Sequence, residues 1–374
     1  MRILTVSNCP LKESQGSGYV IMGYAEGLRR LGHDVECVGP EAYELMPSVR
    51  HAKRWRFALG MALFGVRRRF FSSFDLVEFY GAESWLLVLL LRCVGTRCVL
   101  VHHSNGLETL QQLELTRNSG TDTHSGAPRR WYQFRASSLL AQAFKQVDAL
   151  VLVSRHQHRH AVEMKYQPGD RLLSIETPLP EVFLDQRVDG PRPTTLGYCG
   201  AWLRTKGTDM LTDAVNHLLQ VHPGVTLQLV GVGSEFDKFT VFDPQICGRI
   251  HVSPFIATKP ELMQWYRSIS ILLMPSYSDS FGLVTAEAMA CGCAVVATRT
   301  GFAADLHDRQ EVMLQAGFTA QHVVAAVTPL LESDALRRHV SMGGYQRVQA
   351  LRWDAAAQAL EAFYVRCFAA KRRH

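Results

Sequence analysis

The sequence predicts an α/β protein built from two successive Rossmann-like domains. Short apolar segments alternate with segments of helical periodicity along most of the 374 residues. The alternation stops once, at residues 177–195, where four prolines occur and periodic signals are weak. The chain is also too long for one hydrophobic core, because single domains usually hold about 100–200 residues.

The first elements indicate a parallel sheet. Residues 2–8 form an apolar strand and residues 11–19 a glycine-bearing loop. Residues 20–33 have helical periodicity and reach a glycine at 32, which suits a helix end. A second strand follows at 34–39. A strand, helix and strand in this order form a crossover unit, whose two strands run parallel.

The same alternation continues to the end of the chain. In the first half, strands are expected at residues 74–81, 98–106 and 147–154. After the break, strands are expected at 195–200, 225–231, 249–255 and 270–275, with helices at 207–220, 259–269 and 283–292. We therefore expect an N-terminal domain at 1–180, a linker at 181–194, a second domain at 195–352 and a final helix at 353–374 that packs back on the first domain. Ligands of such sheets bind beyond the carboxyl ends of the strands, so the two domains are expected to face each other across an interdomain cleft.

Composition narrows the class of protein. The net charge of +6 comes without an aromatic-plus-basic surface motif, so we expect no nucleic-acid partner. Nine cysteines without a CxxC pair fit a reducing cytoplasm. The apolar run at 85–91 is too short to span a bilayer, which needs about 20 residues. Segment 53–71 mixes basic and aromatic residues, which fits either peripheral contact with the inner face of the cell membrane or a solvated surface helix.

The strongest chemical signal is a pair of acids eight positions apart. Asp279 falls in the loop after the strand at 270–275, and Glu287 falls about one turn into the next helix. The helix N-terminus between them attracts anions, and Gly282 lets a ligand approach the backbone. Either acid taken alone is more simply a helix cap.

Two further groups lie at strand ends. Arg204 and Lys206 come after the strand at 195–200 and just before a helix, where two cations suit a diphosphate. His102 and His103 end the strand at 98–106, and we interpret His103 as a catalytic contact at the mouth of a cleft.

Several reaction classes are disfavoured. The turn containing Gly16 and Gly18 lacks the GxGxxG spacing of a dinucleotide site, which argues against a nicotinamide dehydrogenase. The sequence contains no HExxH, GxSxG or phosphate-loop lysine motif. No cluster of carboxylates is typical of a metal cage, so we expect no essential metal and no cofactor.

Taken together, these residues resemble the retaining, nucleotide-sugar-dependent glycosyltransferases of the GT-B fold, of the "glycosyl transferases group 1" type. The family signature is two acids around Phe-Gly-Leu, followed by a segment close to EAMACGxPVV. Here it reads DSFGLVTAEAMACGCAVV from Asp279. The glycine turn at 16–18, the segment LRRLGHDV and the segment LRTKG extend the resemblance over nearly the whole chain.

The resemblance implies a role for each of these residues. Asp279 would contact the donor sugar, and the backbone of Phe281, Gly282 and Leu283 would contact sugar and phosphate. Glu287 would hold the ribose hydroxyls. Arg204 and Lys206 would neutralise the donor diphosphate as the leaving group departs. Gly16 and Gly18 would lie close to the diphosphate and the acceptor.

Three positions depart from the family pattern. Aspartate replaces glutamate at 279, which shortens the side chain by one methylene. The usual HGxE reads NGLE at Asn105–Glu108, so either His103 takes the place of the family histidine or Asn105 stands in for it. The segment IETPLP replaces the usual IPNG at the linker.

The resemblance implies a glycosyltransferase that moves a sugar from a nucleoside diphosphate sugar to an acceptor hydroxyl with retention. The expected acceptor is a carbohydrate or a lipid-linked sugar in surface polysaccharide or glycolipid synthesis. Two alternatives stay open, which are a nucleotide-sugar epimerase of the same fold and a non-catalytic subunit that binds sugar nucleotides.

Overall fold

The computed structural model describes residues 1–12, 16–49, 51–68, 73–119, 139–185, 190 and 192–373. The chain forms two compact units. Unit 1 comprises the described residues within Met1–Leu113, Thr121–Pro178 and Trp353–His374, and unit 2 those within Glu114–Gly120 and Leu179–Arg352. The last helix therefore belongs with the first half of the chain, and Leu179–Arg352 forms nearly all of the second unit.

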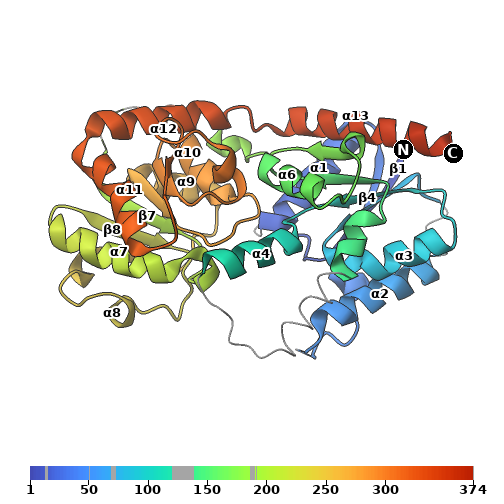
Figure 1. The fold of residues 1–374 in the computed structure, drawn as a ribbon, viewed down its shortest axis with the longest axis horizontal. Coiled ribbons are helices and arrows are strands. Elements are labelled where there is room, and N and C mark those ends of the chain that lie inside the picture. Colours follow the sequence, from blue (N-terminus) through green and yellow to red (C-terminus); the bar gives the residue numbers. More distant parts are fainter. Residues whose placement is uncertain are drawn as a thin grey trace. The chain divides into compact units, whose positions relative to one another are not determined.

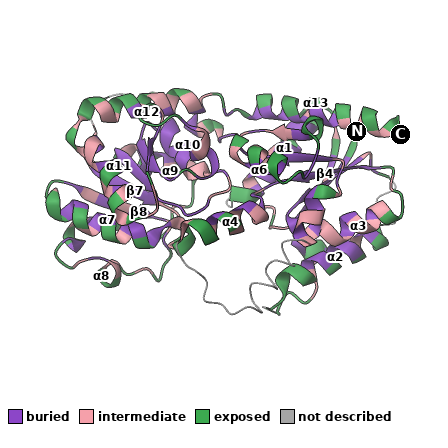
Figure 2. Cartoon of the chain, viewed as in Figure 1, coloured by how far each residue is buried: buried purple, intermediate pink, exposed green. Residues whose placement is uncertain are grey.

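Unit 1 is built on a parallel sheet. Its strands are β1 (Arg2–Ser7), β2 (Asp34–Val38), β3 (Leu76–Tyr80), β4 (Val99–His103), β5 (Ala149–Leu152) and β6 (Leu172–Ser174). Their order in the sheet is β2-β1-β3-β4-β5-β6, and every pairing is parallel. Strand β4 is buried along its length, and it is coloured accordingly in Figure 2. A sheet covered on both faces explains why its strands are continuous apolar runs.

The helices of unit 1 connect these strands. They are α1 (Gly16–Arg30), α2 (Lys53–Arg67), α3 (Trp85–Cys93), α4 (Glu108–Asn118), α6 (Arg155–Glu163) and α13 (Trp353–Arg372), with the end of α4 grouped in unit 2. Helix α1 begins at Gly16, earlier than the sequence predicts. Its first turn includes residues 16–19 of the expected glycine loop. Residues 10–12 cross directly over this turn, where a Cβ on Gly18 would lie 2.4 Å from the carbonyl oxygen of Lys12.

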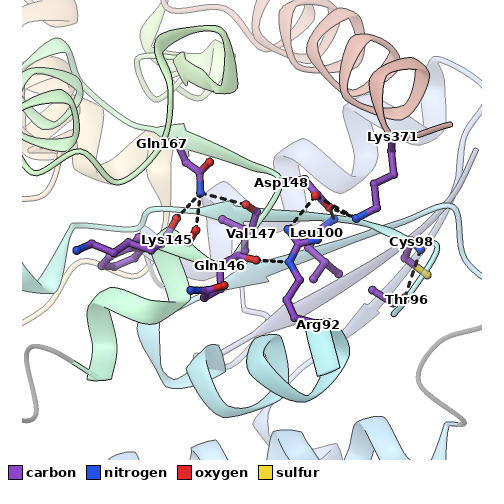
Figure 3. Close-up of polar contacts among 11 residues, drawn as sticks. Arg92, Thr96, Cys98, Leu100, Lys145, Gln146, Val147, Asp148, Gln167 and Lys371 are labelled. Carbon is purple, nitrogen blue, oxygen red and sulfur yellow. Dashed lines mark hydrogen bonds and ion pairs between the residues drawn. The ribbon is translucent and has the colours of Figure 1, made fainter. Parts of the chain in front are cut away.

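The last helix, α13, packs along α1 in Figure 1. A Cβ on Gly23 would lie 2.1 Å from the Trp353 ring, so glycine in α1 lets the first turn of α13 approach. At the other end of the helix, the ammonium of Lys371 lies 3.1 Å from both carboxylate oxygens of Asp148, which also accepts hydrogen bonds from Arg92 and from the Leu100 N–H (Figure 3). Asp148 therefore links α3, the sheet and α13.

Unit 2 repeats the architecture. Its strands are β7 (Thr195–Cys199), β8 (Thr226–Val230), β9 (Ile250–Ser253), β10 (Ile271–Met274), β11 (Ala294–Ala297) and β12 (Met313–Leu314), in the parallel order β12-β11-β10-β7-β8-β9. Its helices are α7 (Thr208–Val221), α8 (Lys238–Val241), α9 (Lys259–Ser268), α10 (Leu283–Ala290), α11 (Ala320–Glu332) and α12 (Asp334–Val348). The core lies between the sheet and α7 and α11, where the apolar faces of both helices are buried.

Two parallel α/β units are thus present, as the alternation of strands and helices predicts. Within the described part of the chain, no helix is both long and apolar enough to cross a membrane.

Candidate active site

The loop that holds Asp279 follows strand β10 at the carboxyl edge of the unit 2 sheet. Asp279 is mostly buried, with 15% of its side chain exposed, and its Oδ2 lies 3.0 Å from the ammonium of Lys206. Its other oxygen accepts a hydrogen bond of 3.0 Å from the Ser280 N–H. The structure therefore brings together two residues that stand 73 positions apart. A carboxylate and an ammonium at a strand end can together bind a polar, negatively charged ligand.

Lys206 reaches Asp279 because two loops touch backbone to backbone. Gly207 adopts φ +69°, and a Cβ there would lie only 1.9 Å from the carbonyl oxygen of Pro275. The Tyr277 N–H donates to the Thr205 carbonyl at 3.0 Å. Only glycine permits both this conformation and this distance. The glycine after Lys206 is therefore a requirement of the site geometry.

Glu287 lies on α10 and is 3% exposed. Its Oε1 is 2.7 Å from the ammonium of Lys259, and its Oε2 accepts a hydrogen bond of 3.0 Å from the Tyr266 hydroxyl. Burial raises the pKa of Tyr266 well above its usual value, and nearby Cys199 and Glu287 raise it further, so this phenol stays a donor. A buried carboxylate is stable only with such partners. The sequence reasoning missed Lys259 and Tyr266, since both precede the signature on the separate helix α9.

Neither acid caps helix α10. The residue before the helix is Gly282, in the left-handed region at φ +93°, and no side chain caps the helix there. The simpler interpretation of these acids as helix caps is therefore wrong. The N-cap glycine thus supplies no side-chain acceptor to the first turn of α10, where a helix N-terminus favours anions.

Phe281 and Leu283 flank this glycine. The Phe281 ring is buried against Phe302, with ring centres 4.9 Å apart, so its side chain serves the core. Its carbonyl accepts from the Phe302 N–H at 2.7 Å, and a Cβ on Gly301 would lie 2.6 Å from it. Leu283 begins the helix and is partly exposed. The contacts of this backbone with sugar and phosphate stay a prediction.

Arg204 points to a different partner. Its Nε lies 3.3 Å from Oδ2 of Asp209, and both side chains are substantially exposed, at 60% and 42%. The same Asp209 oxygen accepts from the Tyr277 hydroxyl at 2.9 Å. An exposed ion pair of this kind contributes under about 1 kcal/mol, so Arg204 can exchange its partner for a phosphate at little cost. Its predicted diphosphate contact stays a prediction.

In unit 1, His103 is buried. The expectation of a histidine pair at the mouth of a cleft is wrong, because His102 and His103 are 1% and 2% exposed and β4 lies inside the sheet. His103 Nε2 lies 3.2 Å from Oε2 of Glu78 and also contacts the Tyr364 hydroxyl. Burial alone would raise the pKa of Glu78, but His103 lowers it below its ordinary value. The ring thus contacts a buried carboxylate beneath α13, and a direct role in catalysis stays a prediction.

Gly16 and Gly18 lie in the first turn of α1, and Gly18 is buried. The predicted diphosphate contact of this turn stays a prediction; the structure gives Gly18 a packing reason, the crossing of residues 10–12 described above.

Asn105 and Glu108 follow strand β4. Burial raises the pKa of Glu108 to about 7, and the neighbouring carboxylate of Glu83 adds to the shift. Oε1 of Glu108 accepts from the Ala82 N–H at 3.1 Å, whereas Oε2 has no hydrogen-bond partner in the described residues. The carboxyl end of this sheet therefore holds a carboxyl group that is largely neutral below pH 7.

Metal binding has no candidate in this part of the molecule. Among the described residues, no group of three or more His, Cys, Asp or Glu side chains could hold a metal ion.

The family models match each half of the chain separately. Residues 14–173 match the model described as "Glycosyltransferase Family 4", and residues 193–333 match the model described as "Glycosyl transferases group 1". The fold and these matches define the chain as a member of the GT-B glycosyltransferases. Within that class it belongs to the group in which a family 4 domain precedes a group 1 domain.

Curated relatives align with part of the chain. A D-inositol 3-phosphate glycosyltransferase of Corynebacterium jeikeium is 34% identical over 185 residues, which are 46% of this chain and 43% of that protein. A protein of the same name from Streptomyces bingchenggensis is 32% identical over 188 residues, which are 47% of this chain and 41% of that protein. The chain therefore spans less than half the length of these two relatives.

Solved structures match the fold over its full length. Sucrose-phosphate synthase from Thermosynechococcus elongatus has a TM-score of 0.74 at 18% identity and covers 99% of this chain and 100% of its own. WaaG, a glycosyltransferase involved in lipopolysaccharide biosynthesis, has a TM-score of 0.69 at 14% identity, covering 98% and 99%. Anabaena HepE, solved in complex with UDP-glucose, has a TM-score of 0.67 at 16% identity, covering 98% and 100%. These likenesses establish the GT-B fold of two α/β domains.

Proposed function

We propose that this protein is a retaining glycosyltransferase that moves a sugar from a nucleoside diphosphate sugar to an acceptor hydroxyl. The observation that carries the proposal is the contact of Lys206 with Asp279, at 3.0 Å, beside the uncapped N-terminus of α10. A cation, a carboxylate and a helix N-terminus whose N-cap residue supplies no side-chain cap meet at one strand end. They offer partners for the phosphate and the hydroxyl groups of a sugar nucleotide.

Each residue then has a defined task. Lys206 and Arg204 bind the diphosphate, and their fixed charge stabilises the negative charge that grows on the leaving nucleoside diphosphate. Asp279 accepts a hydrogen bond from a sugar hydroxyl, and the backbone of Phe281 to Leu283 lies against sugar and phosphate. Glu287, in contact with Lys259 and Tyr266, accepts hydrogen bonds from the ribose. In the reaction the bond from the anomeric carbon to the phosphate oxygen breaks, the acceptor oxygen bonds to that carbon on the same face, and the nucleoside diphosphate and the hydroxyl proton are released.

The acceptor belongs to surface polysaccharide or glycolipid synthesis in this proposal. Similar proteins support a hydroxylated acceptor, since the curated relatives are D-inositol 3-phosphate glycosyltransferases and WaaG is a glycosyltransferase involved in lipopolysaccharide biosynthesis. The protein would act on the cytoplasmic side of the membrane.

Peripheral membrane contact is supported by helix α2. Four apolar residues, Trp55, Leu59, Leu63 and Val66, lie on its outer face and are 41% to 51% exposed. We call these four residues the outer stripe. Arg56 is not part of this surface, since its guanidinium turns inward to the carbonyls of Leu45 and Met46 at 2.7 and 2.6 Å. The predicted segment also includes residues 69–71, which lie outside the described residues. A contiguous apolar stripe on a helix is normally covered, and a bilayer interface would cover this one.

Product analysis tests the proposal. Purified protein is incubated with UDP-, GDP-, ADP- and dTDP-sugars together with candidate acceptors, and the anomeric configuration of the product is read by NMR. We expect transfer with retention, lost in Lys206→Met and in Glu287→Ala but kept in Asp213→Asn, an exposed change on α7. Sugar-nucleotide interconversion without an acceptor would identify an epimerase instead. Binding without turnover in every combination would identify a non-catalytic subunit.

A further inference from the structure

A second pocket lies in unit 1, at the start of helix α2. It is lined by residues 52–55 of α2 and its preceding turn, by Trp85 of α3 and by Leu139 and Leu140, and it has a volume of about 230 Å³. Ligand pockets in proteins commonly measure about 300–1,000 Å³, so this smaller pocket suits part of a ligand rather than a whole one. None of these residues belongs to the carboxylate and lysine site of unit 2.

The wall of this pocket is aromatic and aliphatic. The rings of Trp55 and Trp85 meet edge to face, with centres 5.9 Å apart. Leu140 is 6% exposed and closes the apolar wall, whereas Trp55 is 46% exposed and forms the rim. Two tryptophans at an open apolar pocket fit an amphiphile, because indole combines an apolar ring with one polar N–H group.

The rim is cationic on one side. Lys53 and Arg54 are exposed and occupy the first turn of α2, which contains no acidic residue. Cations at a helix N-terminus are placed unfavourably with respect to the helix dipole, and an anion bound there would relieve the repulsion. Arg54 also lies within electrostatic reach of Glu108, which follows strand β4. The cationic rim is therefore close to the carboxyl edge of the unit 1 sheet.

The pocket continues into the outer stripe, because Trp55 belongs to both. From Trp55 the stripe runs along α2 through Leu59 and Leu63 to Val66. A membrane lipid with an anionic phosphate head and an apolar chain matches these features. Its head fits the cationic rim, and its chain fits the apolar pocket and the adjoining apolar face of α2.

We propose that this pocket binds the lipid part of a phosphate-bearing lipid acceptor, with the chain against Trp55, Trp85 and Leu140 and the phosphate on Lys53 and Arg54. The inference rests on the proposed function, since it names the class of acceptor that the glycosyltransferase would use. The acceptor in this proposal is lipid-linked and is neither a free polysaccharide end nor a free phosphorylated polyol.

Calorimetric titration of the full chain tests this site without any sugar donor. The probe is dodecyl phosphate below its micelle concentration, with inorganic phosphate and dodecyl maltoside as the head-only and neutral-head comparisons. We expect saturable binding of dodecyl phosphate and at least about tenfold weaker binding of both comparisons. The double substitution Lys53→Gln and Arg54→Gln and the single substitution Trp85→Phe should each weaken dodecyl phosphate binding, the first by about tenfold.

Leu63→Ser is the matched control, because Leu63 lies on the same face of α2 but not in the pocket. It should leave dodecyl phosphate affinity unchanged and weaken attachment to phosphatidylglycerol vesicles. Equal loss in Leu63→Ser and the pocket variants would overturn the proposal in favour of general adsorption. So would binding of dodecyl maltoside as tight as that of dodecyl phosphate, or no binding at all. Sugar nucleotides bind to unit 2 under the proposed function. Their titration therefore distinguishes a pocket that binds no lipid from a protein that is not a glycosyltransferase.

Discussion

Replacing Glu108 by glutamine should make the protein more stable at high pH and leave it nearly unchanged at low pH. Burial, with a smaller contribution from Glu83, raises the pKa of Glu108 from its ordinary value of 4.5 to about 7. The folded state therefore binds this proton more tightly than the unfolded state. By linkage, ionisation of Glu108 destabilises the fold as pH rises from about 4.5 to 7, and the full loss remains above pH 7. The shift corresponds to about 3 kcal/mol at most.

Urea unfolding at pH 5 and at pH 8.5 measures this effect. Glutamine has nearly the shape of the neutral carboxylic acid, so Glu108→Gln should differ from the wild type by less than about 1 kcal/mol at pH 5 and exceed it by about 2–3 kcal/mol at pH 8.5. Glu163→Gln, an exposed change on α6, serves as the control and should show no such difference. The reasoning is refuted if the stability difference between Glu108→Gln and wild type is the same at both pH values.

Three further predictions concern the loops and the last helix. Lys206→Met should lower kcat/KM for the sugar nucleotide by about 10²- to 10³-fold, measured by release of the nucleoside diphosphate, with little change in Tm; an unchanged rate would remove Lys206 from the site. Gly207→Ala should destabilise unit 2 by at least about 1–2 kcal/mol in urea unfolding and also reduce donor affinity, because a Cβ there meets the Pro275 carbonyl at 1.9 Å; a variant with wild-type affinity would show that this loop does not position Lys206. Asp148→Asn should speed hydrogen exchange in the last turns of α13, since Lys371 and Arg92 lose their shared partner; unchanged exchange would mean that apolar contacts alone hold this end.

Much of the fold follows from periodicity in the sequence. Buried parallel strands are continuous apolar runs, and helices between them repeat every three to four residues, so both α/β units were predictable. The start of α1 was not, because residues 10–12 cover its first turn and only this tertiary contact shows why Gly18 fits inside the helix. Propensity alone assigns such glycines to a loop.

Some residues of the candidate site could likewise be predicted from the sequence, and others could not. Asp279, Glu287 and Lys206 stand in local motifs at strand ends, and parallel strands bring their ends to one edge. The partners of Glu287 could not be predicted, because Lys259 and Tyr266 come from α9 and meet it only through packing. The burial of His103 could not be predicted for a related reason. A polar residue at the end of a central strand can still lie inside the sheet, and the burial of Glu78 beside it is invisible in the sequence.

The most direct test of the central claim is a calorimetric titration of the full chain with UDP-, GDP-, ADP- and dTDP-sugars, repeated on Glu287→Ala. The account predicts saturable binding of at least one sugar nucleotide to the wild type and a loss of at least about tenfold in affinity in the variant. No binding of any of the four, or equal affinity in the wild type and Glu287→Ala, would contradict a donor site at the carboxyl edge of the unit 2 sheet.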